Sequence, residues 1–486
     1  MHQKLVFNIV ARILFVVCIT MLAPLAWAIL DNPVSAESRA FGITILIGIA
    51  ISLFARMNLK ITDEDFESIS AKDGLAIVGV SWICISAFSA LPFVLSGATP
   101  SYIDAFFETV SGYTTTGATI MTQIESLPRG ILFWRSMTHW LGGMGIIVLS
   151  VALLPALGSG AYKLYRAEAP GPTAERLRPK MKETAKSLWT VYFILTAAET
   201  ALLMAGGMPL FDALCHTFGT MATGGFSTKT ASIGAYGAYI QWIVIVFMLL
   251  AGANFMLHYQ GIRGKLGGYV RDGEFRTYLS LILASIVLFT VILSLNQQSF
   301  SEPTVRQAAF QVVSITTTTG YTTADFNLWP VFLKFALVLL MFVGGCAGST
   351  GGGMKVIRVY VAVKTGFRSI LQAIFPNAVI PVKVSSRAVP DRYILGAVSY
   401  FVIFMFLFAF GIVFLTISEQ SDLVTAMSAS IASLSNIGPG LGKVGAIENY
   451  AWISGPGKVM LSFLMLAGRL ELFSILVLFV PATWKK

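Results

Sequence analysis

The chain has 486 residues, of which 56% are hydrophobic and only 12% are charged, and its mean hydropathy is +0.76. This composition is too apolar for a soluble protein and indicates an integral membrane protein. The net charge of +10 lies mostly between apolar segments, so it gives no reason to expect nucleic-acid binding. The four cysteines form no CxxC pair, which favours packing roles over disulfides or metal ligation.

Ten stretches are apolar and long enough to cross a bilayer, which takes roughly 20 helical residues. The first could pass for a signal peptide, but its long apolar run and the many spans after it favour a retained helix. We therefore expect an all-α integral membrane protein with ten transmembrane helices. They are predicted at about 5–30, 41–57, 75–96, 132–155, 188–207, 238–258, 278–296, 331–362 (interrupted), 393–417 and 457–481.

The positions of the basic residues predict the orientation of these spans. Ten crossings place both termini on one side, and the loops of that side, chiefly 158–187, 259–277 and 355–392, hold most of the 34 Lys and Arg residues. By the positive-inside rule the termini are expected to be cytoplasmic. The opposite loops lean acidic, which either raises the local cation concentration or only solvates that face.

A unit of span, short amphipathic segment, Thr/Gly-rich turn and span occurs four times. Each segment lies between two spans on the expected outer side, and each reaches a glycine after a helix-compatible stretch: Gly117, Gly224, Gly320 or Gly438. The segments read DAFFETVSGYTTTGAT (104–119), DALCHTFGTMATGGFST (212–228), RQAAFQVVSITTTTGYTT (306–323) and VTAMSASIASLSNIGPGLG (424–442).

Helices this short cannot cross the membrane, so each must enter and return. Irregular backbone at membrane depth is tolerated only where it is buried in protein or lines a water-filled path. Four equivalent loops can converge on one axis, where rings of carbonyl oxygens replace the hydration shell of a cation. One Gly/Thr turn could be an ordinary turn, but four in register favour a cation pore.

The loops TTTGAT, ATGGFST, TTTTGYTT and SNIGPGLG resemble the four degenerate selectivity filters of the TrkH/KtrB superfamily of potassium uptake proteins. The resemblance covers essentially the whole chain. It implies an N-terminal two-helix domain (1–70) and four fused pore repeats (71–157, 158–258, 259–364 and 365–486) around a pseudo-fourfold pore. Only the third loop, with Gly320-Tyr321, is close to the potassium-channel filter TVGYG, so we expect uneven rings and weaker discrimination of potassium over sodium than in a strict potassium channel.

The same resemblance implies that potassium, the transported ion, binds mainly backbone carbonyls of the four loops. Their residues are Thr115, Thr116 and Gly117, then Ala222, Thr223 and Gly224, then Thr318, Thr319 and Gly320, and last Asn436, Ile437 and Gly438.

Six glycines interrupt the eighth span, and a glycine inside a helix costs about 1 kcal/mol relative to alanine. We expect a flexible loop below the third filter rather than a helix, although a simple break for packing is the alternative. The GxxxxGK[ST] order and a preceding strand are both missing, which argues against nucleotide binding there. In the resembled family this position corresponds to a loop that obstructs the pore. The glycines are Gly344, Gly345, Gly348, Gly351, Gly352 and Gly353.

Two charged residues lie inside expected spans. Arg469 is expected to face the pore as an electrostatic barrier, as the resemblance also implies, or to pair with a carboxylate or carbonyls of another helix. Glu199 could pair across helices, but the sequence does not identify its partner.

Potassium uptake through a gated pore is the function that the resemblance implies. It also implies a separate cytoplasmic partner similar to TrkA, with nucleotide-binding RCK domains, a homodimer, and a bacterial inner membrane. A secondary active symporter of potassium with protons or sodium is the alternative, although repeats of one orientation disfavour the inverted repeats of such transporters. An intramembrane protease using Ser349 is disfavoured because no histidine follows His258. We expect no enzymatic activity and no bound cofactor.

Overall fold

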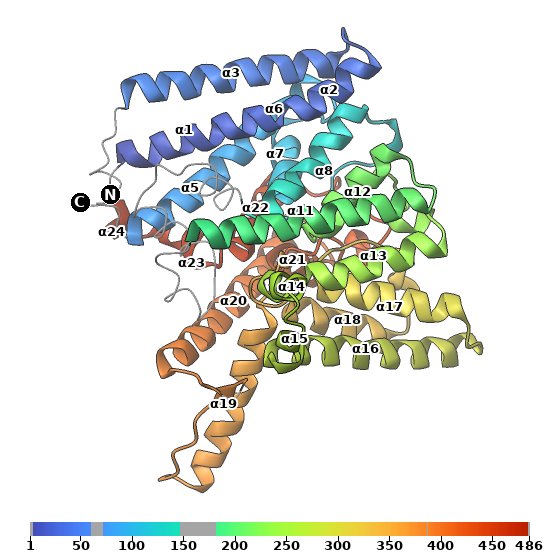
Figure 1. The fold of residues 1–486 in the computed structure, drawn as a ribbon, viewed down its shortest axis with the longest axis vertical. Helices are drawn as coiled ribbons and strands as arrows, with labels where there is room; N and C mark the ends of the chain where they lie inside the picture. The colour runs from blue at the N-terminus through green and yellow to red at the C-terminus, as the bar shows by residue number, and fades with distance from the viewer. Residues whose placement is uncertain (1–2, 60–70, 146–180, 386, 485–486) are drawn as a thin grey trace.

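The computed structural model describes residues 3–59, 71–145, 181–385 and 387–484. These residues form a bundle of helices, together with one antiparallel ribbon of β1 (Lys383–Val384) and β2 (Arg387–Ala388) (Figure 1). Among them, six helices are long and apolar enough to cross a membrane, and a bent pair makes up to seven. The predicted all-α membrane fold is confirmed, and the other expected spans contain shorter helices.

The helices follow the order that the repeat predicts: an N-terminal group and then four groups that each contain one short helix. The N-terminal group is α1 (Gln3–Thr20), α2 (Leu22–Asp31) and α3 (Ala36–Asn58). The first repeat has α5 (Ala71–Ser89), α6 (Leu91–Leu95), α7 (Tyr102–Tyr113) and α8 (Arg129–Gly143); the second has α11 (Met181–Ala205), α12 (Leu210–Met221), α13 (Ala238–Ala251), α14 (Phe255–Ile262) and α15 (Gly267–Arg271).

The third repeat has α16 (Gly273–Gln297), α17 (Glu302–Thr316), α18 (Val331–Val343) and α19 (Val356–Ile374). The fourth has α20 (Asp391–Ser418), α21 (Leu423–Leu434), α22 (Gly455–Arg469), α23 (Phe473–Leu476) and α24 (Pro481–Trp484). The proposed domain boundaries stay predictions. The one at 157/158 lies outside the described residues, and those at 258/259 and 364/365 fall inside α14 and α19, so α14 and α15 are counted here with the second repeat and α19 with the third.

Two expected spans are broken where the sequence remains apolar. The span expected at 238–258 divides into α13 and α14, which are bent by 102°. The side chain of Asn254 caps α14 by accepting a hydrogen bond from the N–H of Met256 at 2.8 Å. The span expected at 457–481 leaves the helix after Arg469, where Glu471 and Leu472 have φ values of 62° and 57°.

The other irregular spans agree with expectation as far as they are described. The predicted interruption of 331–362 is present, because α18 ends at Val343 and α19 begins at Val356. Of the span expected at 132–155, α8 covers the part up to Gly143, and residues 146–155 lie outside the described residues.

The four short helices α7, α12, α17 and α21 lie among the longer ones and are buried on nearly every side. We call them the pore helices. Each packs against the last span of its own repeat and against that of the preceding repeat: α7 against α22, α12 against α8, α17 against α13, and α21 against α18. The first repeat thereby contacts the fourth, so the four units close into a ring.

Candidate ion pore and gate

The four pore helices end in the same way, which defines equivalent positions in the four loops. After each helix, three successive N–H groups bond back to carbonyls four, three and five residues earlier. The middle residue of the three has a left-handed backbone, which is uncommon outside glycine. Its φ is 53° at Thr115, 55° at Thr223, 62° at Thr318 and 56° at Asn436.

A second left-handed residue follows two positions later in each loop, and it is always a glycine. Its φ is 80° at Gly117, 80° at Gly225, 79° at Gly320 and 96° at Gly438. This corrects the expected second loop, because Gly225 and not Gly224 is the equivalent of the other three glycines.

The correction shifts the second loop by one residue. Thr223, Gly224 and Gly225 match Thr115, Thr116 and Gly117, whereas Ala222 is the cap of α12 and matches Thr114. Two adjacent glycines made both registers possible in the sequence.

The loops meet one another in cyclic order. A methyl group on Gly117 would overlap the carbonyl oxygen of Gly224, and one on Gly225 would overlap that of Thr319. In the same way Gly320 lies against the carbonyl oxygen of Ile437, and Gly438 against that of Thr116. The four carbonyls occupy equivalent positions, and each lies against the glycine of the preceding loop, so they form a closed ring. Glycine is required here for close approach as well as for positive φ.

The threonine run of the third loop is fully buried. The hydroxyls of Thr317 and Thr319 bond to each other at 2.8 Å, as do those of Thr114 and Thr116 in the first loop. Hydroxyl groups thus satisfy one another behind the loop. The fourth loop contacts the first through Asn436, whose side-chain amide donates to the Thr116 hydroxyl at 3.1 Å.

We call the segments that begin at the four left-handed glycines the outer limbs of the loops. Tyrosine hydroxyls bond to the outer limbs of the second and fourth loops. Tyr321 donates its hydroxyl to the carbonyls of His216 at 2.9 Å and Phe226 at 3.2 Å, which ties the third loop to the second. Tyr450 donates to the carbonyl of Gly438 at 2.6 Å. The carbonyl of Gly438, which is one of the predicted ion ligands, therefore already accepts a hydrogen bond. The four loops are not equivalent in this respect.

A cavity of about 80 Å³ opens on the outer side of the ring. Its lining includes the four left-handed glycines together with side chains of both signs, among them Arg135, Lys229 and Glu448. The volume accommodates a small number of water molecules, as a hydrated ion requires.

The glycine-rich loop 344–355 lies on the opposite side, directly against the ends of the pore helices. The N–H of Gly352 donates to the hydroxyl of Thr318 at 2.6 Å, and a methyl group on Gly352 would overlap the carbonyl oxygen of Ser435. Thr350 donates its hydroxyl to the carbonyl of Met221 at 3.0 Å. We call this segment the gate loop after the role that the sequence predicts for it, which stays a prediction. Gly344, Gly348 and Gly353 turn it with φ values of 78°, 76° and 70°. Gly345 and Gly351 are packed inside it.

Arg469 joins the gate loop to the end of α8. Its guanidinium donates to the carbonyl of Thr350 at 2.6 Å and to the carbonyls of Gly142 and Gly143 at 2.7 and 2.9 Å. The expected binding to carbonyls of other segments is present, and the role of Arg469 as an electrostatic barrier stays a prediction.

Three anchors of the gate loop were missed in the sequence. Glu274, at the start of α16, accepts hydrogen bonds from the N–H groups of Ala347 at 2.7 Å and Ile357 at 3.2 Å. The ammonium of Lys355 donates to the carbonyl of Gly351 within the loop. Arg358 pairs with Glu471, in the break after α22. Glu471 lies only two residues after Arg469 in the sequence, and this second charge in an apolar span was the signal that could have indicated a partner such as Arg358. Glu199 is fully buried on α11, which packs against α12.

Comparison with known proteins identifies the family to which this chain belongs. The family model of TrkH, described as a cation transport protein, matches residues 41–486. The Trk system potassium uptake protein TrkH of Salmonella typhimurium is 40% identical over 100% of both chains, and that of Halomonas elongata is 42% identical over 100% of both. The crystal structure of the potassium transporter TrkH from Vibrio parahaemolyticus matches with a TM-score of 0.88 and 35% identity over 100% of both chains. The chain therefore belongs to the TrkH family of cation transport proteins.

Proposed function

We propose that this protein takes up potassium through a pore whose selectivity filter is formed by the four loops. The closed ring of carbonyl oxygens from Thr116, Gly224, Thr319 and Ile437 is the observation that carries this proposal. Carbonyl rings of this kind substitute for the hydration shell of an alkali cation. The curated relatives named above are potassium uptake proteins, which supports potassium as the ion.

The neighbouring carbonyls extend the proposed path along the axis. In the corrected register they belong to Thr115, Thr223, Thr318 and Asn436 below the ring, and to Gly117, Gly225, Gly320 and Gly438 above it. Ala222, in the register first expected, belongs one step lower with the other helix caps. The C-terminal ends of the four pore helices point toward this path and favour a positive ion.

The gate loop closes the path on its inner side in this proposal. Its backbone is bonded to Thr318 and packed against Ser435, so an ion leaving the filter meets Gly351 and Gly352. Arg469 would act as the latch, because it bonds to the loop and to the end of α8 at once. Arg469→Ala is expected to raise ion flux per protein, and unchanged flux would contradict this role.

In this proposal, breaking the hydrogen bonds of Arg469 requires free energy from a binding partner outside the pore. We propose a cytoplasmic partner similar to TrkA, with nucleotide-binding RCK domains, acting on a homodimer in the bacterial inner membrane with cytoplasmic termini. The described basic residues on the expected inner side, such as the exposed Arg263, Lys265 and Arg271, offer it a positively charged surface.

The test is tracer rubidium uptake into vesicles that contain only the purified chain, with potassium or sodium as competitor. Potassium should block uptake at a much lower concentration than sodium, because dehydrated potassium fits the carbonyl ring. Equal competition by sodium would refute the filter. A parallel measurement with and without a pH gradient separates a pore from a proton-coupled symporter, since only the symporter needs the gradient.

A further inference from the structure

One position of each pore helix ties that helix to the outer limb of its own loop. This position lies six residues before the helix cap, and in α7 it is Glu108. Its carboxylate accepts hydrogen bonds from the hydroxyl of Thr119 at 2.8 Å and from the N–H of Ile120 at 2.9 Å. The first loop is therefore braced from behind by a charged group.

The other three repeats use neutral groups for the same purpose. His216 of α12 lies 2.9 Å from the hydroxyl of Ser227, and Gln311 of α17 donates to Thr323 at 3.4 Å. In α21 the position is an alanine, and the preceding Ser428 bonds to the backbone of Leu441 at 2.9 Å. At this position the charged group is a feature of the first repeat among these four, although Asp212, four residues earlier in α12, also accepts a hydrogen bond from the hydroxyl of Thr228 at 2.6 Å.

Arg135 of α8 forms an ion pair with Glu108 and also bonds to the second loop. Its Nε donates to the Glu108 carboxylate at 2.6 Å, with side chains 2% and 0% exposed. Its NH1 donates to the carbonyl of Ser227 at 2.9 Å, and the guanidinium lies 3.6 Å from the ring centre of Phe226. The carbonyl of Phe226 accepts from Tyr321, so the network reaches three of the four loops.

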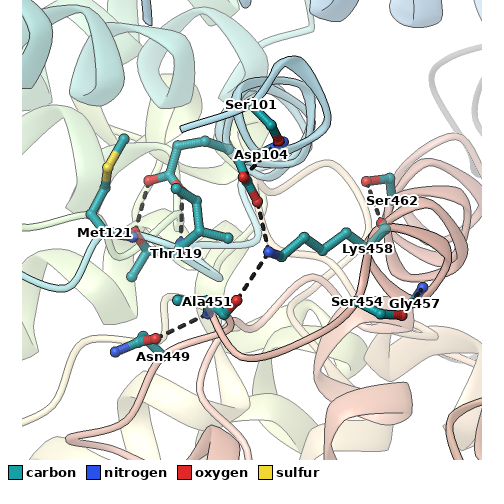
Figure 2. A network of polar contacts seen from close by, with 12 residues as sticks. Ser101, Asp104, Thr119, Met121, Asn449, Ala451, Ser454, Gly457, Lys458 and Ser462 are labelled. Carbon is teal, nitrogen blue, oxygen red and sulfur yellow. Dashed lines mark hydrogen bonds and ion pairs between the residues drawn. The ribbon is translucent and has the colours of Figure 1, made fainter. Parts of the chain in front are cut away.

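A second buried pair on α7 is built in the same manner toward the fourth repeat. Lys458 of α22 donates to Asp104 at 2.6 Å and to the carbonyl of Ala451 at 3.0 Å. Figure 2 shows Lys458 reaching from its helix to Asp104, with Thr119 beside the same pore helix. The first pore helix therefore carries two carboxylates, and each holds a cation that also bonds to a neighbouring outer limb.

The charge of Arg135 has a consequence for ion entry because this residue lines the outer cavity. An uncompensated guanidinium at the mouth of a cation pore repels the ion strongly where water is scarce. Glu108 cancels that charge. Replacing a buried ion pair by apolar residues is often neutral for stability, so a role in the loops it touches is the better explanation for this pair.

We propose that Glu108 and Arg135 are positioning residues that hold the first and second loops in register and keep the outer mouth neutral. The register sets the discrimination between potassium and sodium, and the neutrality sets the rate of cation entry. This inference rests on the proposed potassium pore, whose outer loops the pair braces.

Three variants separate the two effects. Glu108→Gln removes the charge and faces the N–H of Ile120 with a poorer acceptor, so both uptake and the preference for potassium should fall, each about tenfold. Adding Arg135→Gln removes the stranded positive charge, so uptake should recover while the preference stays low. Glu108→Asp keeps the charge but shortens the reach, so uptake should be near normal with a reduced preference; it also serves if the neutral variant does not fold.

The assay is rubidium uptake into vesicles of the full chain, with the ratio of sodium to potassium concentrations that half-inhibit uptake as the measure of preference. This ratio does not depend on how many gates are open. Arg129→Gln is the matched control, because it breaks the exposed pair with Asp31 at 3.2 Å on the same outer side. It should leave uptake and ratio unchanged.

Two results would overturn the proposal. One is a wild-type ratio in the variants Glu108→Gln and Glu108→Asp; the other is a double variant whose uptake is no better than that of Glu108→Gln. If the wild-type protein itself shows no preference for potassium, the proposed function fails first, and the brace fails with it. Elution of each variant as a single folded species in gel filtration accompanies every measurement.

Discussion

Substituting Gly225 by alanine tests the corrected register of the second loop. The residue has a φ of 80°, where a side chain costs about 1–2 kcal/mol through its contact with the following carbonyl. The new methyl group would also overlap the carbonyl oxygen of Thr319. Either loop must then move by about 1 Å to restore an ordinary contact. A displacement of that size opens the carbonyl ring between the second and third loops.

Gly224→Ala is the informative comparison, because Gly224 was first expected to hold this position. Its φ is not left-handed, and the added methyl group would meet the imidazole of His139 rather than a carbonyl of the ring. Equivalent positions in the other loops are occupied by Thr116, Thr319 and Ile437, so the backbone itself accepts a side chain there. We expect Gly224→Ala to lower stability while keeping more of the preference for potassium.

The measurement is the sodium-to-potassium ratio for inhibition of rubidium uptake, together with the melting temperature of each purified variant. Gly225→Ala should bring the ratio close to one. Gly366→Ala in α19 is the control, since nothing lies within 4 Å of its added methyl group. If Gly224→Ala destroys the preference and Gly225→Ala preserves it, the register derived from the backbone is wrong.

Three further perturbations address the gate and the outer limbs. Arg469→Ala frees the gate loop from the carbonyls of Thr350, Gly142 and Gly143, so rubidium uptake at equal protein amounts should rise several-fold; an unchanged rate would exclude the latch. Thr318→Val removes the acceptor for the N–H of Gly352 at nearly constant volume, so the closed pore should leak more, and uptake as low as that of the wild type would show that this bond does not hold the gate. Tyr321→Phe removes the hydroxyl that joins the third loop to the second, which should lower the free energy of unfolding by about 1 kcal/mol and reduce the preference for potassium; competition assays would reveal an unaltered ratio if the tie is dispensable.

The sequence predicted the four short helices. It also predicted which glycine has positive φ in three of the four loops, because each of these three loops has one glycine at the expected position. In the first, third and fourth loops one glycine follows the β-branched or polar residues, so Gly117, Gly320 and Gly438 could be aligned without ambiguity. In the second loop Gly224 and Gly225 are adjacent, and composition alone cannot say which has positive φ. Hydrogen bonds back to the helix decide it, and these exist only in the folded chain.

The breaks inside apolar spans were missed for a different reason. Hydropathy measures the cost of leaving water, and a window long enough to find a span averages over short polar stretches such as those around Asn254 and Arg469. Two contacts mark the break after α13. Asn254 supplies a cap for α14, and the N–H of Cys346 from the gate loop bonds to the carbonyl of Gly252 at 2.8 Å. A contact between segments almost a hundred residues apart leaves no periodic signal. The partners of Arg469 are hidden in the same way, because they are backbone carbonyls of other segments.

Fusion of four repeats in one chain is what closure of the proposed pore by a single loop would require. The gate loop belongs to the third repeat only, yet it contacts the ends of α12 through Met221, of α17 through Thr318 and of α21 through Ser435. The end of α7 is reached indirectly, since Arg469 bonds to the carbonyl of Gly142, and Gly142 packs against the backbone of Tyr113. Withdrawing the loop would therefore release all four pore helices at once. In a ring of four identical subunits every subunit would carry such a loop. The proposed gating by one loop therefore depends on the divergence of the four repeats.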